Sequence, residues 1–260
     1  MLYNMKRCAL SCFLYFLFIG FALAQGEGWQ RSSSTHFLVY YKNAPEEFID
    51  KVKQKAEECY DKIAEDLGFR RYDFWLWDDR ARIYIYDDAQ GYYLATKQSS
   101  WSDGCAYPKE KTIHSFVQSK SFFDTVLPHE MGHIVFREFV GFNNPQIPLW
   151  LDEGVASYEQ SLRASTASLI KEAKASGKFI PFSALSDFSL HEASVPLEQV
   201  QLFYAESVNL LEYLVKKFGK ESFVEFCRAL RDKRDFASSL ASVYPYSSPT
   251  ELGQEWEKYL

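Results

Sequence analysis

Strand-forming patterns are confined to the first half of this 260-residue chain, and helical patterns dominate the second half. Three short segments are rich in β-branched and aromatic residues, which is typical of strands: 36–41, 82–86 and 111–117. Because the strand patterns precede a mainly helical block, the sequence predicts an α+β fold. We expect one domain over residues 25–260, with a sheet-containing half at 25–140 and a helical half at 141–260.

Apolar residues at helical spacing predict several helices, whose ends are marked by glycine or proline. The expected helices lie at 46–67, 122–140, 151–175 and 202–218. The polar segment Gln90–Ala106 contains Gly, Ser and Asp and is predicted to be a long surface loop. Residues 141–148 hold Gly, Asn and Pro and are predicted to connect two helices.

The N-terminus has the pattern of a secretory signal peptide. Lys6 and Arg7 precede a short apolar run, and the Ala-Leu-Ala segment at 22–24 matches a cleavage site between small residues. The run is short for a membrane span, so residues 1–24 are predicted to be removed and the protein to be secreted or periplasmic. The mature chain would then start near Gln25. The alternative is an uncleaved N-terminal anchor.

The charge of the chain argues against two classes of partner. The formal net charge is −6 at pH 7, and loss of Lys6 and Arg7 with the leader would make it −8. Nucleic acids and anionic membranes both reward clustered Lys and Arg. We therefore expect no nucleic-acid partner and no membrane contact beyond the possible anchor, and the oligomeric state is left open.

Three cysteines remain after removal of the leader: Cys59, Cys105 and Cys227. An exported protein could pair two of them, and any of the three pairings is possible on sequence grounds. Their spacing to one another and to the histidines does not match a thiolate metal site.

The segment His129-Glu130-Met131-Gly132-His133 has the spacing of a metal site. Residues four apart lie on one face of a helix, so the two imidazoles can reach one ion at about 2.0–2.1 Å. Glu130 lies further round the helix, where it can approach a metal-bound water as a general base. The alternative is a chance motif on a solvated helix. The apolar residues around the motif oppose this, because buried histidines and carboxylates need partners.

A catalytic zinc site needs a third protein ligand, and the segment Trp-Leu-Asp-Glu-Gly-Val-Ala at 150–156 supplies Glu153. It lies at the start of the next predicted helix, after a connection long enough to bring that helix back beside the first. The sequence therefore predicts one Zn2+ per chain, bound by His129, His133 and Glu153.

With these residues the chain resembles the gluzincin metallopeptidases, the thermolysin-like and aminopeptidase-like group with an HExxH…E zinc site. More closely, it resembles the peptidase-MA-like domain of exported bacterial proteins. The matching segments are 129–133, 150–156, 204–219 and 251–260, of which only the first two are chemically specific. The last of them fits the C-terminal helix of the family. The resemblance implies a zincin-like fold, with a small mixed β-sheet and an active-site helix followed by a mainly helical C-terminal half. It also implies a hydrolase that acts on a peptide or protein substrate.

The resemblance further implies roles for individual residues. Glu130 would take a proton from metal-bound water as it attacks the peptide carbonyl and pass it to the leaving amine. Related enzymes stabilise the oxyanion with a Tyr or His, for which Tyr204 is the candidate; its packing in the core is the alternative. His114 and His191 are weaker candidates. In zincins the substrate commonly adds to an edge strand, and 111–117 is the candidate strand here.

Three departures from the gluzincin pattern affect the prediction of turnover. Ser157 stands where thermolysin-like enzymes have an Asp that orients a zinc ligand, so either Ser157 or Asp152 would take that role. Pro128 precedes His129, so the helix either starts near Asp124 or kinks at the site. The aminopeptidase signature Gly-x-Met-Glu-Asn is missing, so an endopeptidase is expected. The rival interpretation is a catalytically inactive zinc-site protein that binds peptides or cell-envelope partners.

Overall fold

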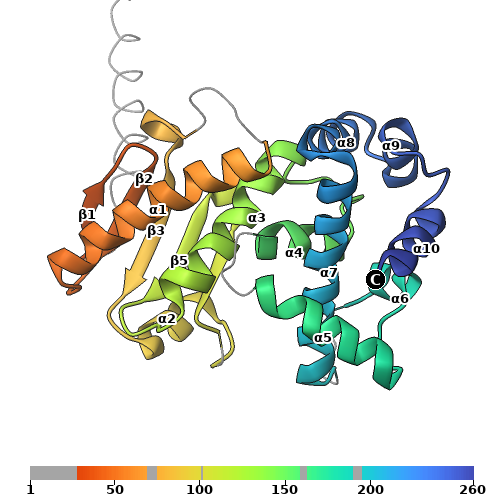
Figure 1. Cartoon of the computed structure of the whole chain (residues 1–260). Coiled ribbons are helices and arrows are strands. Elements are labelled where there is room, and N and C mark those ends of the chain that lie inside the picture. Colours follow the sequence, from red (N-terminus) through yellow and green to blue (C-terminus); the bar gives the residue numbers. More distant parts are fainter. Residues whose placement is uncertain (1–27, 69–74, 101, 159–162, 190–194) are drawn as a thin grey trace, which may run out of the picture.

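The computed structural model describes residues 28–68, 75–100, 102–158, 163–189 and 195–260 (Figure 1). The strands in this part of the chain are β1 (Gln30–Ser33), β2 (Phe37–Tyr41), β3 (Ala81–Tyr86), β4 (Gly104–Tyr107) and β5 (Thr112–Phe116). The α-helices are α1 (Glu46–Asp66), α2 (Ala89–Thr96), α3 (Leu127–Val140), α4 (Leu149–Tyr158), α5 (Arg163–Ser176), α6 (Phe182–Ser186), α7 (Leu197–Phe218), α8 (Lys220–Lys233), α9 (Phe236–Val243) and α10 (Pro249–Tyr259). Three short turns complete the described elements: η1 (Trp77–Asp79), η2 (Pro108–Glu110) and the π-helical η3 (Phe122–Val126).

The strands form one mixed sheet in the order β1-β2-β3-β5-β4. β2, β3 and β5 run parallel to one another, and β1 and β4 pair antiparallel at the two edges. The helices from α4 onward gather beside the sheet, on the right-hand side of Figure 1. The chain thus has an α+β fold with a small mixed sheet and a mainly helical C-terminal half, which confirms the predicted fold class.

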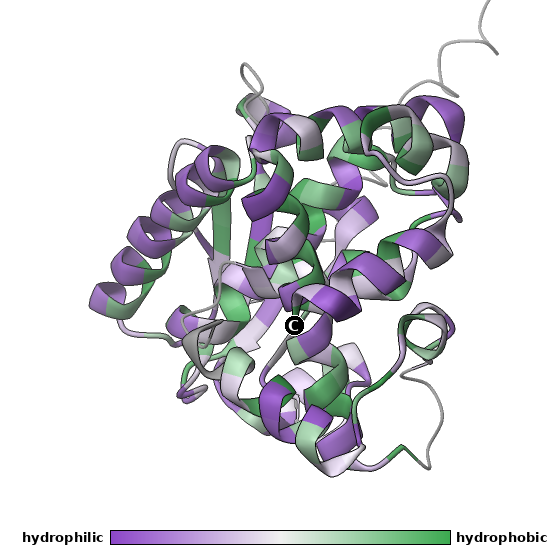
Figure 2. Ribbon diagram, turned by 45° about the vertical axis from the view of Figure 1, so that its right-hand side comes forward, coloured by the Kyte–Doolittle hydropathy of each residue, from purple (hydrophilic) through white to green (hydrophobic). Residues whose placement is uncertain are grey.

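The core joins the sheet to the helix that carries the HExxH motif. Val39, Ile83 and Ile113 have no exposed surface and belong to one buried cluster with Val52 of α1 and Met131 of α3. In Figure 1, α3 lies between the sheet and the helical half. Hydrophobic segments occupy the middle of the molecule, while the peripheral helices carry hydrophilic residues on their outer sides (Figure 2). The motif helix is therefore held by packing on both sides.

The segment Gln90–Ala106 is not the long surface loop that the sequence predicted. Helix α2 occupies its first part, and Asp88 caps this helix by accepting a hydrogen bond of 2.7 Å from the Gly91 N–H. Strand β4 occupies its end. It is only 4 residues long and pairs with β5. Its strand character therefore comes from pairing and not from its composition.

Strand β4 also corrects the predicted edge strand. The segment 111–117 contains β5, which is an interior strand between β3 and β4, so its backbone has no free edge for a substrate. The edge that packs against α3 and η3 is β4. Gly104 makes this packing possible, because a Cβ there would lie 2.2 Å from Cγ1 of Val126 and 3.1 Å from the carbonyl oxygen of His114.

The other helix predictions are confirmed with small shifts. The segments 46–67, 202–218 and 251–260 correspond to α1, α7 and α10, although α7 already begins at Leu197. Gly68 and Gly219 follow α1 and α7 with φ of 72° and 86°, a conformation that favours glycine, and so these residues end the helices.

The segment predicted as a single helix over 151–175 is instead two helices, α4 and α5. Residues 159–162 between them lie outside the described part of the chain. Within the described ranges no helix is long and apolar enough to cross a membrane. The predicted signal peptide at 1–24 lies outside these ranges.

Candidate metal centre

The HExxH motif occupies the start of α3. Pro128 is in the first turn of this helix, a position at which proline is tolerated. The preceding π-helical turn η3 leads into α3, and the Val126 N–H donates to the carbonyl oxygen of Ser121 at 3.1 Å. The sequence placed the start of the helix near Asp124; the π-helical turn occupies Phe122–Val126 instead, and the α-helix itself begins at Leu127.

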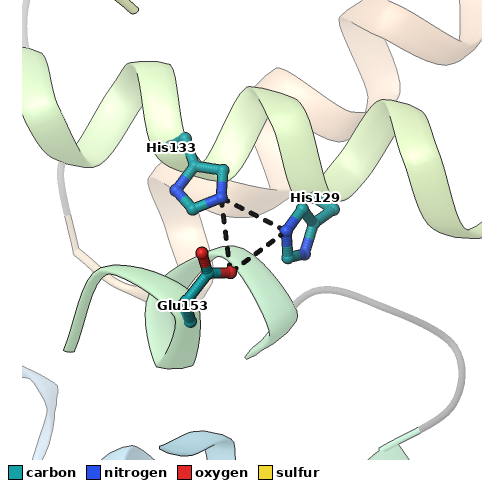
Figure 3. Close-up of side chains that lie close together, drawn as sticks. All are labelled: His129, His133 and Glu153. Atoms are coloured by element: carbon teal, nitrogen blue, oxygen red, sulfur yellow. Dashed lines mark hydrogen bonds and ion pairs between the residues drawn. The ribbon is translucent and has the colours of Figure 1, made fainter. Parts of the chain in front are cut away.

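The side chains of His129, His133 and Glu153 meet at one point between α3 and α4 (Figure 3). The Nε2 atoms of the two histidines lie 3.2 Å apart. Oε2 of Glu153 lies 3.4 Å from Nε2 of His129 and 3.6 Å from Nε2 of His133. Tetrahedral ligands at about 2.0–2.1 Å from a zinc ion lie roughly 3.3 Å apart. The three atoms thus form a triangle of the size that a tetrahedral zinc site requires.

Two glycines bring the helices close enough for this meeting. Helix α4 is buried from Trp150 to Tyr158. A Cβ at Gly132 in α3 would lie 2.8 Å from Cα of Ala156 in α4, and a Cβ at Gly154 in α4 would lie 2.7 Å from the carbonyl oxygen of Ser207 in α7. Both distances are too short for a real side chain. Glycine at these two positions therefore sets the separation of α3, α4 and α7, and with it the position of Glu153.

The chemistry of the three side chains fits a zinc ion. Glu153 is 7% exposed, and its Oε2 has no hydrogen-bond partner among the described residues. Burial alone would raise the pKa of Glu153, but the adjacent His133 and His129 outweigh it and hold the pKa well below its usual range. A buried carboxylate aimed at two imidazoles requires a compensating cation. Two imidazole nitrogens and one carboxylate oxygen are a donor set of catalytic zinc sites.

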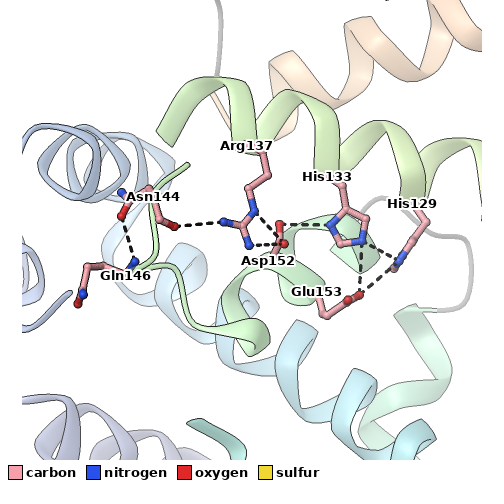
Figure 4. Close-up of polar contacts among 7 residues, drawn as sticks. All are labelled: His129, His133, Arg137, Asn144, Gln146, Asp152 and Glu153. Atoms are coloured by element: carbon pink, nitrogen blue, oxygen red, sulfur yellow. Dashed lines mark hydrogen bonds and ion pairs between the residues drawn. The ribbon is translucent and has the colours of Figure 1, made fainter. Parts of the chain in front are cut away.

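Asp152, and not Ser157, lies against His133, one of the three donor side chains (Figure 4). Its Oδ1 is 3.2 Å from Nδ1 of His133, and its Oδ2 accepts hydrogen bonds of 2.9 and 2.7 Å from Nε and Nη2 of Arg137. Oγ of Ser157 is buried without a hydrogen-bond partner in the described structure. Burial would lower the pKa of His133, but the carboxylates of Asp152 and Glu153 outweigh it and raise this pKa well above its ordinary value.

Tyr204 is brought to the same place by α7. Its ring centroid lies 6.1 Å from that of His129. It is inside the helix and not at its start as the sequence suggested. Burial, together with the negative charges of Glu153 and Glu130, raises the pKa of Tyr204 far above that of a free tyrosine. The phenol is therefore protonated at any physiological pH. Glu130, the residue after His129, is partly exposed.

The remaining candidate residues are not brought into the triangle. His114 stacks on Tyr84 in the sheet, with ring centroids 4.8 Å apart, and burial lowers its pKa to about 4. His191 lies outside the described residues. Among the described residues, no disulfide joins Cys59, Cys105 or Cys227, so the structure forms none of the three possible pairings.

Sequence reasoning missed Arg137 and Asn144. Arg137 is four residues after His133, so the spacing that joined the two histidines could have identified it as a third side chain on the same face. Asn144 donates to the carbonyl oxygens of Val140 and of Leu230 in α8, at 3.3 and 2.9 Å. Its distant partner left no local signal in the sequence.

Comparison with known proteins identifies the family. The model of the peptidase MA superfamily matches residues 57–260, and the chain therefore belongs to this superfamily. This confirms the gluzincin resemblance, and the family and the fold together support a metallopeptidase function.

Solved structures of yeast LTA4 hydrolase are similar to the chain in fold. The complex with bestatin has a TM-score of 0.56 and the native enzyme one of 0.53, both at 17% sequence identity. Each alignment covers 89% of this chain and 39% of the hydrolase chain, so the chain spans about two fifths of the length of these structures. Comparison with curated protein sequences gives no match.

Proposed function

We propose that the chain is a zinc-dependent endopeptidase of the gluzincin type, with one zinc ion held by His129, His133 and Glu153. One observation carries the proposal. Three buried or partly buried donor atoms from two helices form a triangle of 3.2, 3.4 and 3.6 Å, and the carboxylate oxygen in it has no hydrogen-bond partner among the described residues. Membership of the peptidase MA superfamily supports peptides as the substrate class.

The residues around the triangle would divide the work of hydrolysis. When bound, zinc would supply Lewis acidity toward the substrate carbonyl and lower the pKa of water to about 7. Glu130 directly follows His129 in α3, and its side chain is partly exposed. It can therefore accept a proton from the attacking water and pass it to the leaving amine. Tyr204, whose high pKa keeps its phenol protonated, would donate a hydrogen bond to the developing oxyanion.

The Glu130→Gln variant tests this division of work. Gln keeps the size of the side chain but cannot accept a proton, so the variant should retain zinc and lose peptide cleavage by at least about 100-fold. Zinc content is measured by elemental analysis and cleavage with a peptide library. Glu225→Gln, at an exposed position of α8, is the matched control and should cleave like the wild type.

Two outcomes would contradict the proposal in different ways. Full cleavage by Glu130→Gln would show that another group is the base. A wild-type protein that binds zinc and peptides but cleaves no better than Glu130→Ala would favour the inactive zinc-site protein. His129→Ala completes the series, because it should lose zinc.

The endopeptidase assignment has a separate test. An aminopeptidase needs the free amino terminus of its substrate, whereas an endopeptidase does not. Peptides with an acetylated N-terminus and an internal fluorophore–quencher pair should therefore be cleaved as well as their free counterparts. Cleavage of the free peptides alone would overturn the endopeptidase assignment and leave the metallopeptidase in place.

We also propose that the protein is exported after removal of residues 1–24. The basic start, the apolar run and the Ala-Leu-Ala segment at 22–24 support this. The intact mass of protein recovered outside the cytoplasm should correspond to a chain that starts near Gln25. A full-length mass in the membrane fraction would show an uncleaved anchor instead.

A further inference from the structure

Three basic side chains of α3 face two adjacent carboxylates of α4 (Figure 4). His129, His133 and Arg137 are each four residues apart and so lie along one face of the helix. Oε2 of Glu153 lies within ion-pair distance of the Nε2 atoms of both histidines. Asp152 lies between the other ring nitrogen of His133 and the guanidinium of Arg137.

The two oxygens of Asp152 have different partners. Oδ2 accepts two hydrogen bonds from Arg137, at 2.9 Å from Nε and 2.7 Å from Nη2. Oδ1 is buried and lies 3.2 Å from Nδ1 of His133. A carboxylate held at one oxygen by a planar guanidinium has a fixed direction for the other. The orientation of Oδ1 toward the imidazole thus depends on Arg137.

Arg137 is itself tied to the connection between α3 and α4. Its Nη1 donates to the carbonyl oxygen of Asn144 at 3.5 Å. Asn144 is 3% exposed, and its side chain donates to the carbonyl oxygen of Leu230 at 2.9 Å and accepts from the Gln146 N–H at 3.1 Å. The guanidinium of Arg137 therefore binds a backbone carbonyl of Asn144, and the side chain of Asn144 is in turn hydrogen-bonded to α8.

We propose that Arg137 is a positioning residue for the metal centre: it fixes Asp152 so that Oδ1 orients the imidazole of His133 with Nε2 toward the ion. An oxygen that accepts from Nδ1–H leaves the lone pair of Nε2 for a metal. Asp152 thereby takes the role that Ser157 does not fill. The inference rests on the proposed zinc site, and it does not depend on peptidase activity.

The test measures zinc affinity in the absence of substrate. The zinc dissociation constant is determined by competition with a chromophoric chelator at constant pH. Loss of a group that orients a ligand typically weakens metal binding about 10- to 100-fold, which is the expected effect of Arg137→Gln. Arg137→Lys keeps the charge but cannot make the two-point contact, so its affinity should lie between those of the wild type and Arg137→Gln.

A matched ion pair on the same helix separates positioning from general destabilisation. Lys111 lies 3.1 Å from Glu138 of α3, with side-chain exposures of 14% and 16%, against 20% and 12% for Arg137 and Asp152. Lys111→Met should lower the melting temperature of the metal-free protein and leave zinc affinity unchanged. Wild-type zinc affinity in Arg137→Gln, or an equal loss of affinity in Lys111→Met, would overturn the proposal.

A second variant covers the case in which Arg137→Gln does not fold. Asp152→Asn keeps the shape of the side chain but gives Arg137 a neutral partner, so zinc binding should again weaken about 10-fold. Unchanged affinity in Asp152→Asn would refute the proposal. A wild-type protein that binds zinc without cleaving peptides would contradict only the peptidase, whereas one that binds no zinc would contradict both.

Discussion

Replacing Glu206 by Gln should make the stability of the protein less sensitive to a rise in pH between about 5 and 8. Glu206 in α7 has no exposed surface. Its Oε1 accepts a hydrogen bond of 3.0 Å from the Ile180 N–H, and its Oε2 has no hydrogen-bond partner among the described residues. Burial is the main cause that raises the pKa of Glu206 to about 8; the hydrogen bond from Ile180 opposes this rise, and Glu257 adds to it. Gln has the shape of the protonated side chain and keeps an acceptor for Ile180.

The sign and size of the effect follow from proton binding. The unfolded chain releases the proton of Glu206 near pH 4.5, whereas the folded protein keeps it to about pH 8. Stabilisation by the protonated form is complete below the lower value and is lost as the pH rises through the upper one. Each pKa unit corresponds to about 1.4 kcal/mol, so the free energy of unfolding can fall by at most about 5 kcal/mol over this range.

Urea unfolding of the wild type and Glu206→Gln at about pH 5, 7 and 9, with a chelator present, measures this difference. The variant should match the wild type most closely at the lowest pH and exceed it by a few kcal/mol at the highest. Glu198→Gln is the control, because the Glu198 side chain on the same helix is 67% exposed. Parallel pH profiles for the wild type and Glu206→Gln would refute the burial argument.

Two further substitutions probe the walls of the centre. Gly154→Ala forces α4 and α7 apart, because its Cβ would lie 2.7 Å from the Ser207 carbonyl oxygen, and should cost about 1–3 kcal/mol in urea unfolding and weaken zinc binding. Gly91→Ala, whose Cβ would meet Asp88 Oδ1 at 3.4 Å, should be harmless; equal losses would contradict the packing argument. Tyr204→Phe should lower kcat about 100-fold without changing zinc affinity, and an unchanged kcat would remove the phenol from the mechanism.

The parts of the structure that local chemistry determines could be predicted from the sequence. The two histidines are joined by the geometry of one helical turn, and the ends of α1 and α7 by Gly68 and Gly219, whose positive φ favours glycine. The approach of Glu153 to the two histidines could be predicted because its segment has a recognisable pattern and a connection of suitable length. Each of these inferences needed only residues that are close in the sequence.

The parts that long-range pairing determines could not be predicted. Strand β4 has 4 residues and a loop-like composition, and only its pairing with β5 makes it a strand. The predicted edge strand was wrong for the same reason, because the edge of a sheet is defined by which strand lies last. The Asp88 cap of α2 was a usable local signal, since Asp before a helix commonly accepts from its first N–H groups.

The metal centre depends as much on packing residues as on ligands. Gly132 lies inside the HExxH motif but has no side-chain donor atom. It packs against Ala156 of α4, and a Cβ at this position would lie only 2.8 Å from the Cα atom of Ala156. Gly154 follows the ligand Glu153 and makes the corresponding contact with α7. Since the ligand atoms are only 3.2 to 3.6 Å apart, a displacement of α4 by the width of a methyl group would open the triangle. The small residues beside Glu153 and the two histidines therefore set the geometry, while these three donor side chains would determine what the centre can bind.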